Sequence, residues 1–175
     1  MTIKTANRCN RLRLAPATTA ALLASTALVS AQTALPTGGQ VAAGSVTISA
    51  SGPAMTVTQG SQRAIVNWQG FSVGQPNSVH FAQPSASSAI LNRVTGSASS
   101  TIAGQITGNG QVFLVNPNGI AITATGTVKV GGGFVASTLG IEDRDFMAGR
   151  LQFNGGSAPA AVSNDGAITA GSGGF

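Results

Sequence analysis

The stretch that decides the fold is GQVFLVNPNGIAITATGTVKV, residues 110–130. Val112 to Val115 form a continuous apolar run, and Ile120 and Ile122 alternate with smaller residues, so both flanks are typical of β-strands. Between them, Asn116-Pro117-Asn118-Gly119 predicts a type I turn, because Asn can bond the backbone two residues on and Pro fixes the next φ. A type I turn does not match the twist of a tight hairpin. We therefore expect a corner at which the chain changes direction between short strands.

The composition from Gln32 onward is that of an all-β protein. Gly, Ser, Thr, Ala, Val and Asn dominate, and units of Gly, one residue and a β-branched residue recur, as in GSVTI at 44, GQI at 104, GTVKV at 126 and GAI at 166. A β-sandwich is the alternative, but sandwich strands usually carry more aromatic residues, and this chain has no Tyr and one Trp. The pattern predicts a parallel β-helix, a solenoid with Asn and Gly at its corners and stacked apolar residues inside.

The two ends of such a solenoid are expected to differ. The first coil requires an N-terminal cap that covers its core and its strand edge. We place this cap across Gly44 to Phe81, which includes the aromatic segment from residue 62. The C-terminal stretch VSNDGAITAGSGGF, residues 162–175, predicts one more strand and a turn. It shows no matching cap, so we expect an N-terminal piece of a longer protein, truncated at its C-terminal end.

Residues 1–31 have the pattern of a secretory signal peptide. Four basic residues come before an uncharged stretch from Leu14 to Ala31, which ends in the small-residue pattern Val29-Ser30-Ala31. A membrane-spanning helix is the weaker reading, because Pro16 and several Ser and Thr dilute the stretch. We expect export through the Sec translocon, cleavage near Ala31, and one domain over residues 32–175.

Removal of this leader changes the charge balance. The chain has nine basic and four acidic residues, and the leader contributes Lys4, Arg8, Arg11 and Arg13. The remaining five basic residues are scattered, so no nucleic-acid partner is expected. Cys9, the single cysteine, also lies in the leader, so the domain must be stabilised without disulfides.

Two groups of residues are candidates for a catalytic or metal site. Gly70-Phe71-Ser72-Val73-Gly74 matches a nucleophile elbow, but no helix follows and His80 precedes every acidic residue, so Ser72 is interpreted as a polar strand or turn residue. The charge cluster from Glu142 to Asp145 lacks the further oxygen ligands of a calcium loop. It predicts a solvated turn or short helix. His80 alone cannot form a zinc site, and we predict no catalytic, metal or cofactor-binding residues.

Three segments carry a family resemblance: residues 65–96, 110–122 and 132–153. Within them stand Asn92-Arg93-Val94, Asn116 to Ile120 and Ala136-Ser137-Thr138-Leu139. Together they resemble the haemagglutination-activity, or two-partner-secretion, domain of filamentous haemagglutinins and high-molecular-weight adhesins of Gram-negative bacteria. Gln75-Pro76-Asn77-Ser78 occupies the place of that family's second asparagine-proline motif but begins with Gln.

The resemblance implies a right-handed parallel β-helix with an N-terminal antiparallel cap. It also implies passage through the periplasm, and then recognition by the periplasmic domains of an outer-membrane barrel transporter, which delivers the protein to the cell surface or the medium. The first hypothesis is therefore a non-enzymatic secretion module of a large adhesin or haemagglutinin. A host receptor or glycan would be bound by regions downstream.

The alternative is the export module of a secreted toxin, such as a cytolysin or contact-dependent inhibition effector. A glycan-cleaving β-helix enzyme is disfavoured, because it would need clustered acidic groups that this chain hardly supplies.

Two roles remain open for the Asn116–Gly119 motif. It is either a corner needed for folding or a signal read by the transporter. Asn92 and Arg93 are supporting candidates, with Arg93 either a paired structural ion or a transporter contact. As a simple corner, Asn116→Ala would cost about 1 kcal/mol, the usual value of one local hydrogen bond.

Overall fold

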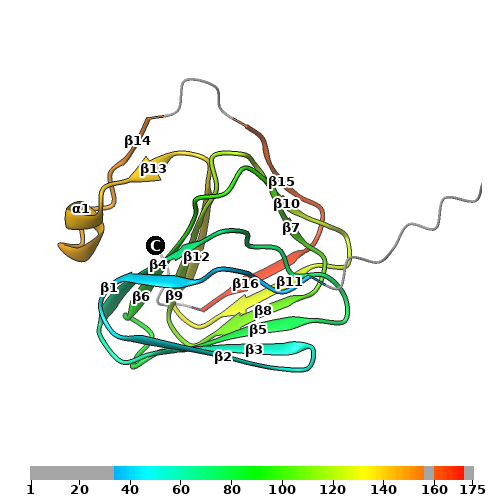
Figure 1. The fold of residues 1–175 in the computed structure, drawn as a ribbon, viewed down its shortest axis with the longest axis horizontal. Helices are drawn as coiled ribbons and strands as arrows, with labels where there is room; N and C mark the ends of the chain where they lie inside the picture. The colour runs from blue at the N-terminus through cyan, green and yellow to red at the C-terminus, as the bar shows by residue number, and fades with distance from the viewer. Residues whose placement is uncertain (1–33, 156–159, 172–175) are drawn as a thin grey trace, which may run out of the picture. The chain divides into compact units, whose positions relative to one another are not determined.

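A computed structural model describes residues 34–155 and 160–171 of the chain. The signal peptide predicted for residues 1–31 lies outside these residues. The described strands form a right-handed parallel β-helix in which each complete coil contributes one strand to each of three sheets (Figure 1). The predicted fold class is confirmed.

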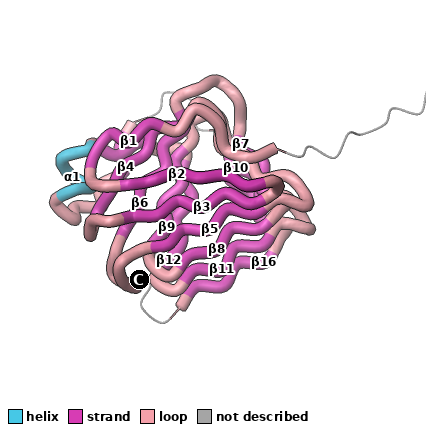
Figure 2. Tube along the Cα trace, turned by 60° about the horizontal axis from the view of Figure 1, so that its bottom comes forward, coloured by secondary structure: helices cyan, strands magenta, loops and turns pink. Residues whose placement is uncertain are grey.

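The first sheet has six strands, in the order β16-β11-β8-β5-β3-β2. Figure 2 shows these strands stacked in register along one face. Its strands are β2 (Val46–Ser51), β3 (Ala54–Gln59), β5 (Ser78–Ala82), β8 (Gln105–Gly108), β11 (Thr127–Val130) and β16 (Ala167–Ala170).

The second and third sheets complete the coils. The second sheet contains β1 (Gln40–Ala43), β4 (Arg63–Trp68), β6 (Ala89–Val94), β9 (Gln111–Val115) and β12 (Gly133–Ser137). The third contains β7 (Ser100–Ile102), β10 (Ile120–Ile122) and β15 (Val162–Asn164). The predicted strands on either side of the Asn116–Gly119 motif are therefore confirmed as β9 and β10, which belong to different sheets.

The N-terminal cap is shorter than the sequence predicts. At this end the antiparallel strands are β1, which begins before Gly44 and pairs with β4, and β2, which pairs with β3; β3 already pairs parallel with β5. The bounds Gly44 to Phe81 were wrong because Trp68, Phe71 and Phe81 do not close the end of the solenoid. All three fill its interior, each 2% exposed or less.

The C-terminal end also differs from expectation. The stretch from residue 162 forms two strands, not one, because the chain bends at Asp165-Gly166 from β15 in the third sheet to β16 in the first. Both strands continue the parallel stacking, β15 on β10 and β16 on β11.

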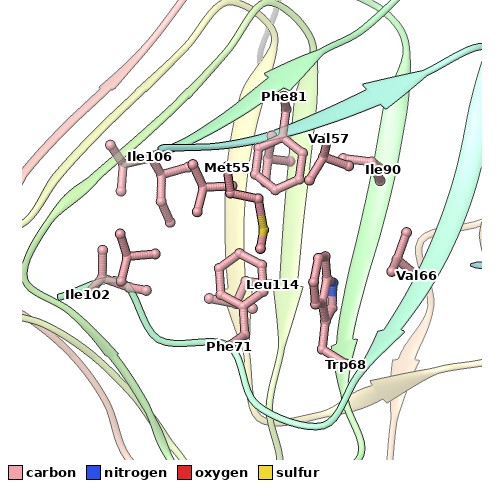
Figure 3. Packing of buried hydrophobic residues seen from close by; sticks show 14 of the residues in the cluster. Met55, Val57, Val66, Trp68, Phe71, Phe81, Ile90, Ile102, Ile106 and Leu114 are labelled. Carbon is pink, nitrogen blue, oxygen red and sulfur yellow. The ribbon is translucent and has the colours of Figure 1, made fainter. Parts of the chain in front are cut away.

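The interior of the coils is an apolar core made by alternate residues of the strands. Figure 3 shows the rings of Trp68 and Phe71 beside Leu114 and Met55. The two rings meet edge to face, with centroids 5.5 Å apart, a geometry that adds to the stability gained from burial. Backbone ladders between coils satisfy the polar main chain around this core.

A second, smaller core lies outside the coils. Between β12 and β15 the chain leaves the solenoid and forms β13 (Gly140–Ile141), the helix α1 (Asp143–Met147) and β14 (Phe153–Asn154). We call residues 138–155 the insertion. Its buried residues Ile141 and Phe146 pack on the outward-facing side chains of the second sheet, among them Leu91 and Phe113. Of the two alternatives predicted around Asp143, a solvated turn or a short helix, the structure forms the helix, and its buried Phe146 covers an apolar surface.

Candidate functional site

The Asn116–Gly119 motif forms the corner between β9 and β10. The Gly119 amide donates to the Asn116 carbonyl at 3.1 Å, and the Asn118 amide donates to Asn116 Oδ1 at 2.9 Å. Both bonds agree with the predicted turn. Gly119 has φ +109°, a conformation that favours glycine because it has no Cβ.

The Asn116 side chain does more than shape its own turn. It is fully buried, and its Nδ2 donates to the Ala98 carbonyl at 3.0 Å and to Ser100 Oγ at 2.9 Å. Its backbone amide donates to the Ser137 carbonyl at 3.0 Å on the other side. Asn116 therefore joins three successive coils.

The motif has a buried half and an exposed half. Asn116 and Gly119 are buried, whereas Pro117 and Asn118 are exposed. Asn118 Nδ2 donates to the Gly96 carbonyl of the preceding coil at 2.8 Å. Only Pro117 and Asn118 thus present side chains that another protein could contact while the domain stays folded.

Asn92 lies inside the solenoid and is fully buried. Its Oδ1 accepts a 3.0 Å hydrogen bond from Trp68 Nε1, and its Nδ2 donates to the Phe113 carbonyl at 3.2 Å. An unpaired indole N–H in an apolar core would cost free energy. Asn92 supplies that partner, and it is bonded to both neighbouring coils.

Arg93 follows Asn92 on β6 and points to the opposite side, toward the insertion. Its Nη2 lies 2.7 Å from Asp143 Oδ1 and donates to the Ile141 carbonyl at 2.7 Å. Arg93 side-chain exposure is 22%. In this structure its guanidinium is committed to contacts within the chain.

A second arginine of the same sheet holds the other end of α1. Arg63 Nη1 donates to the Phe146 carbonyl at 3.1 Å, and its guanidinium lies 5.5 Å from the centroid of the Phe146 ring. A cation near the last carbonyls of a helix also interacts favourably with the helix dipole. Arg63 and Arg93 therefore attach the insertion at two points.

The structure adds a group of buried glutamines that sequence reasoning missed. Gln83 Nε2 donates to Gln59 Oε1 at 3.1 Å and to the Ser88 carbonyl at 3.1 Å, and Gln83 Oε1 accepts from the Gly110 amide. These side chains bond the corners between the first and second sheets. Their only sequence signal is a Gln at or just beyond the end of β3 and β5.

The remaining sequence candidates have local roles. Ser72 Oγ accepts from the Thr101 amide at 3.0 Å, and His80 Nδ1 lies 2.8 Å from Thr107 Oγ1. Gln75-Pro76, a cis peptide, borders a groove of about 500 Å³ at the corner before β5. Asp143 pairs with Arg93, whereas Asp145 pairs with Arg150 at 2.6 Å and lies 4.0 Å from Arg144.

In residues 34–155 and 160–171, no three His, Cys, Asp or Glu side chains are grouped to hold a metal ion. In the same residues, no helix has the length and apolar character to cross a membrane.

Among curated proteins, the chain is similar to two heme/hemopexin-binding proteins of Haemophilus influenzae. It is 42% identical to one, from strain Rd, over 108 residues, which are 62% of this chain and 12% of that relative. It is 39% identical to the other over 99 residues, 57% of this chain and 11% of the relative. The chain thus matches only a small part of each relative's length.

A solved structure and a family model agree with these likenesses. The crystal structure of the HMW1 secretion domain from Haemophilus influenzae superposes with a TM-score of 0.72 at 35% identity, over 77% of this chain and 36% of that one. The family model described as the TPS secretion domain matches residues 29–175. This chain belongs to the TPS secretion domain family, the secretion module of exported two-partner exoproteins.

Proposed function

We propose that this domain directs the secretion of a large surface-exposed or secreted adhesin or haemagglutinin, and that a cognate outer-membrane transporter recognises it through periplasmic domains. The observation that carries the proposal is the family match over residues 29–175, which includes every coil of the solenoid. The domain acts as a binding and transport module and not as an enzyme. A host receptor or glycan is the partner of regions beyond the domain.

The Asn116–Gly119 corner supports a division of labour within this function. Asn116 joins three coils, and Pro117 and Asn118 lie exposed beside it. The buried half forms the corner, and the exposed half is the element that the transporter reads. Asn92 and Arg93 support it indirectly, because they hold the core and the insertion of the same coils.

Co-expression tests the proposal directly. The chain is produced with and without a cognate outer-membrane transporter, and its amount is measured in the periplasm and in the medium. Release into the medium only when the transporter is present is expected. Equal release from cells without any such transporter would refute transporter recognition.

The same cultures test the route of export. We propose Sec-dependent export with cleavage after Val29-Ser30-Ala31, so N-terminal sequencing of exported protein should begin near Gln32. Exported protein that retains Met1 would show that residues 1–31 are not a cleaved signal peptide.

A second candidate concerns the exported protein as a whole. The two curated relatives are named for binding heme or hemopexin, which favours a heme-acquiring exoprotein over a toxin as the source of this domain. Titration of the full exoprotein with heme and with hemopexin, followed by absorbance and by surface binding, would separate this candidate from an adhesin. If the exoprotein binds neither heme nor hemopexin but adheres to host cells, the adhesin is favoured.

A further inference from the structure

Three Asn-Gly pairs occur in the described part of the chain: Asn109-Gly110, Asn118-Gly119 and Asn154-Gly155. Asn followed by Gly is the sequence most open to deamidation, in which the following backbone nitrogen attacks the Asn side-chain carbonyl. Glycine permits this attack because it has no Cβ to obstruct it. The three pairs share the same local chemistry, so differences among them must come from the fold.

Two of the pairs are restrained at both reacting groups. The Gly110 amide donates to Gln83 Oε1 at 3.0 Å, and the Asn109 side chain both donates to and accepts from the Gln83 backbone. The Gly119 amide donates to the Asn116 carbonyl at 3.1 Å, and Asn118 Nδ2 donates to the Gly96 carbonyl at 2.8 Å. Attack at either site requires at least two hydrogen bonds to break first.

The third pair has neither restraint. Asn154 is the last residue of β14 and Gly155 lies just beyond it, and both are exposed. Within residues 34–155 and 160–171, the Asn154 side chain makes no hydrogen bond and the Gly155 amide donates none. Gly155 has φ +85°, and a Cβ built on it would meet no atom within 4 Å.

From these contacts we infer that Asn154 is a site of spontaneous deamidation in the folded domain. The Gly155 nitrogen loses its proton to solvent and bonds to Asn154 Cγ, and the side-chain nitrogen leaves as ammonia, which gives a cyclic succinimide. Water then opens the ring at one of its two carbonyls. The products are aspartate and isoaspartate, and no oxidant, reductant or enzyme is required.

The modification acts on the contact that closes the insertion. Asn154 pairs with Gly140 in the two-stranded sheet of β13 and β14, and it borders an open groove of about 580 Å³ with Arg93, Glu142 and Asp143. Either product puts a new carboxylate into a groove that is also lined by Arg93 and Arg144. Isoaspartate in addition lengthens the backbone within β14, which shifts the ladder hydrogen bonds and weakens the β13–β14 pairing.

The test is peptide mapping of the purified full chain during incubation at mildly alkaline pH. Mass spectrometry measures the amide-to-acid conversion at all three sites, and digestion products separate aspartate from isoaspartate. We expect Asn154 to react at least about tenfold faster than Asn109 or Asn118, because each of those sites must first lose at least two hydrogen bonds. Comparable rates at the three sites in the folded chain would overturn the inference.

Two controls make the comparison specific. In denaturant the three rates should converge, because the restraints at Asn109 and Asn118 are then gone. A persistent lead of Asn154 in denaturant would show that the fold is not the cause, and would also overturn the inference. The variant Asn154→Gln, whose longer side chain closes a ring less readily, should lose the fast conversion while the other two sites keep their rates.

Discussion

Asn116 and Ser100, two residues without solvent exposure, are joined across neighbouring coils by a 2.9 Å hydrogen bond that the side-chain Nδ2 of Asn116 donates to the Ser100 hydroxyl. The sequence alone presents Asn116 as the first residue of a turn. In the folded domain its side chain holds that turn against the corner of the preceding coil. A substitution of Asn116 is therefore expected to lower the stability of the domain by more than the loss of one local turn bond.

The first prediction is that Asn116→Ala destabilises the domain by about 2–4 kcal/mol, more than the single local bond of a simple corner. The substitution removes four hydrogen bonds and leaves the Ser100 hydroxyl and the Ala98 carbonyl without this donor. Urea denaturation of the purified domain measures the loss. A midpoint that falls by only the amount expected for an exposed turn residue would contradict the role of the Asn116 side chain in joining neighbouring coils.

Asn116 is therefore a poor residue with which to detect recognition, because secretion and stability should fall together. The second prediction uses Asn118→Ala with Thr125→Ala as its matched control. Both residues are exposed at corners, and each side chain donates to a carbonyl of the preceding coil, Gly96 at 2.8 Å and Ala103 at 2.9 Å. Each substitution should cost about 1 kcal/mol.

If the transporter reads the exposed half of the motif, Asn118→Ala lowers secretion strongly and Thr125→Ala does not. Secreted protein is measured with the transporter present, beside the denaturation midpoint of each variant. Equal secretion of the two variants would show that the motif is a corner and not a signal.

The third prediction concerns the polar pair inside the core. Asn92→Leu removes the acceptor of Trp68 Nε1 and should cost about 1–3 kcal/mol, the penalty of leaving a buried donor unpaired. Since Trp68 is the single tryptophan, its fluorescence follows both unfolding and the local change. Leu114→Met, on the ladder position next to Asn92, is the control, because it changes shape without removing a polar partner.

If the Asn92→Leu variant is as stable as the wild type, the Trp68 indole N–H either finds another acceptor or stays unpaired without a measurable loss of stability. The emission spectrum distinguishes this outcome, because an altered indole environment shifts the maximum even where the midpoint stays unchanged.

Local chemistry allowed part of this structure to be predicted. The turn at residues 116–119, the strands on either side and the short helix near Asp143 follow from residue types within a few positions of one another. The residue limits of the cap could not be predicted in this way. Strand β2, which pairs antiparallel with β3, and strand β3, which pairs parallel with β5, have the same kind of alternating small and apolar residues. Parallel or antiparallel pairing depends on strands distant in the sequence.

The contacts that give Asn116, Arg63 and Arg93 their roles are also distant. Arg63 meets the Phe146 carbonyl, and Arg93 meets the Ile141 carbonyl, across several coils of intervening chain. No spacing rule links such positions. Arg93 could be expected to need a partner, but the partner follows only from the stacking register of the coils and the path of the insertion.

The last prediction asks what holds the insertion to the second sheet. The ion pair of Arg93 with Asp143 is partly exposed, 22% and 52% by side chain, and a pair of this kind contributes about 0–1 kcal/mol. Phe146 is fully buried, with its ring 5.2 Å from that of Phe113, and Phe→Ala in such a place costs about 3–5 kcal/mol. Apolar packing should therefore dominate over the ion pair.

Trypsin cleavage after Arg144 and Arg150 reports on detachment of the insertion, because both residues lie within it. Phe146→Ala should increase this cleavage strongly, whereas Asp143→Asn should change it little, and added salt should leave the wild type resistant. Asp143→Asn is a close control, because it keeps the side-chain shape and removes only the charge. If Asp143→Asn or salt released the insertion as fully as Phe146→Ala, the arginine contacts and not the buried ring would be its main attachment.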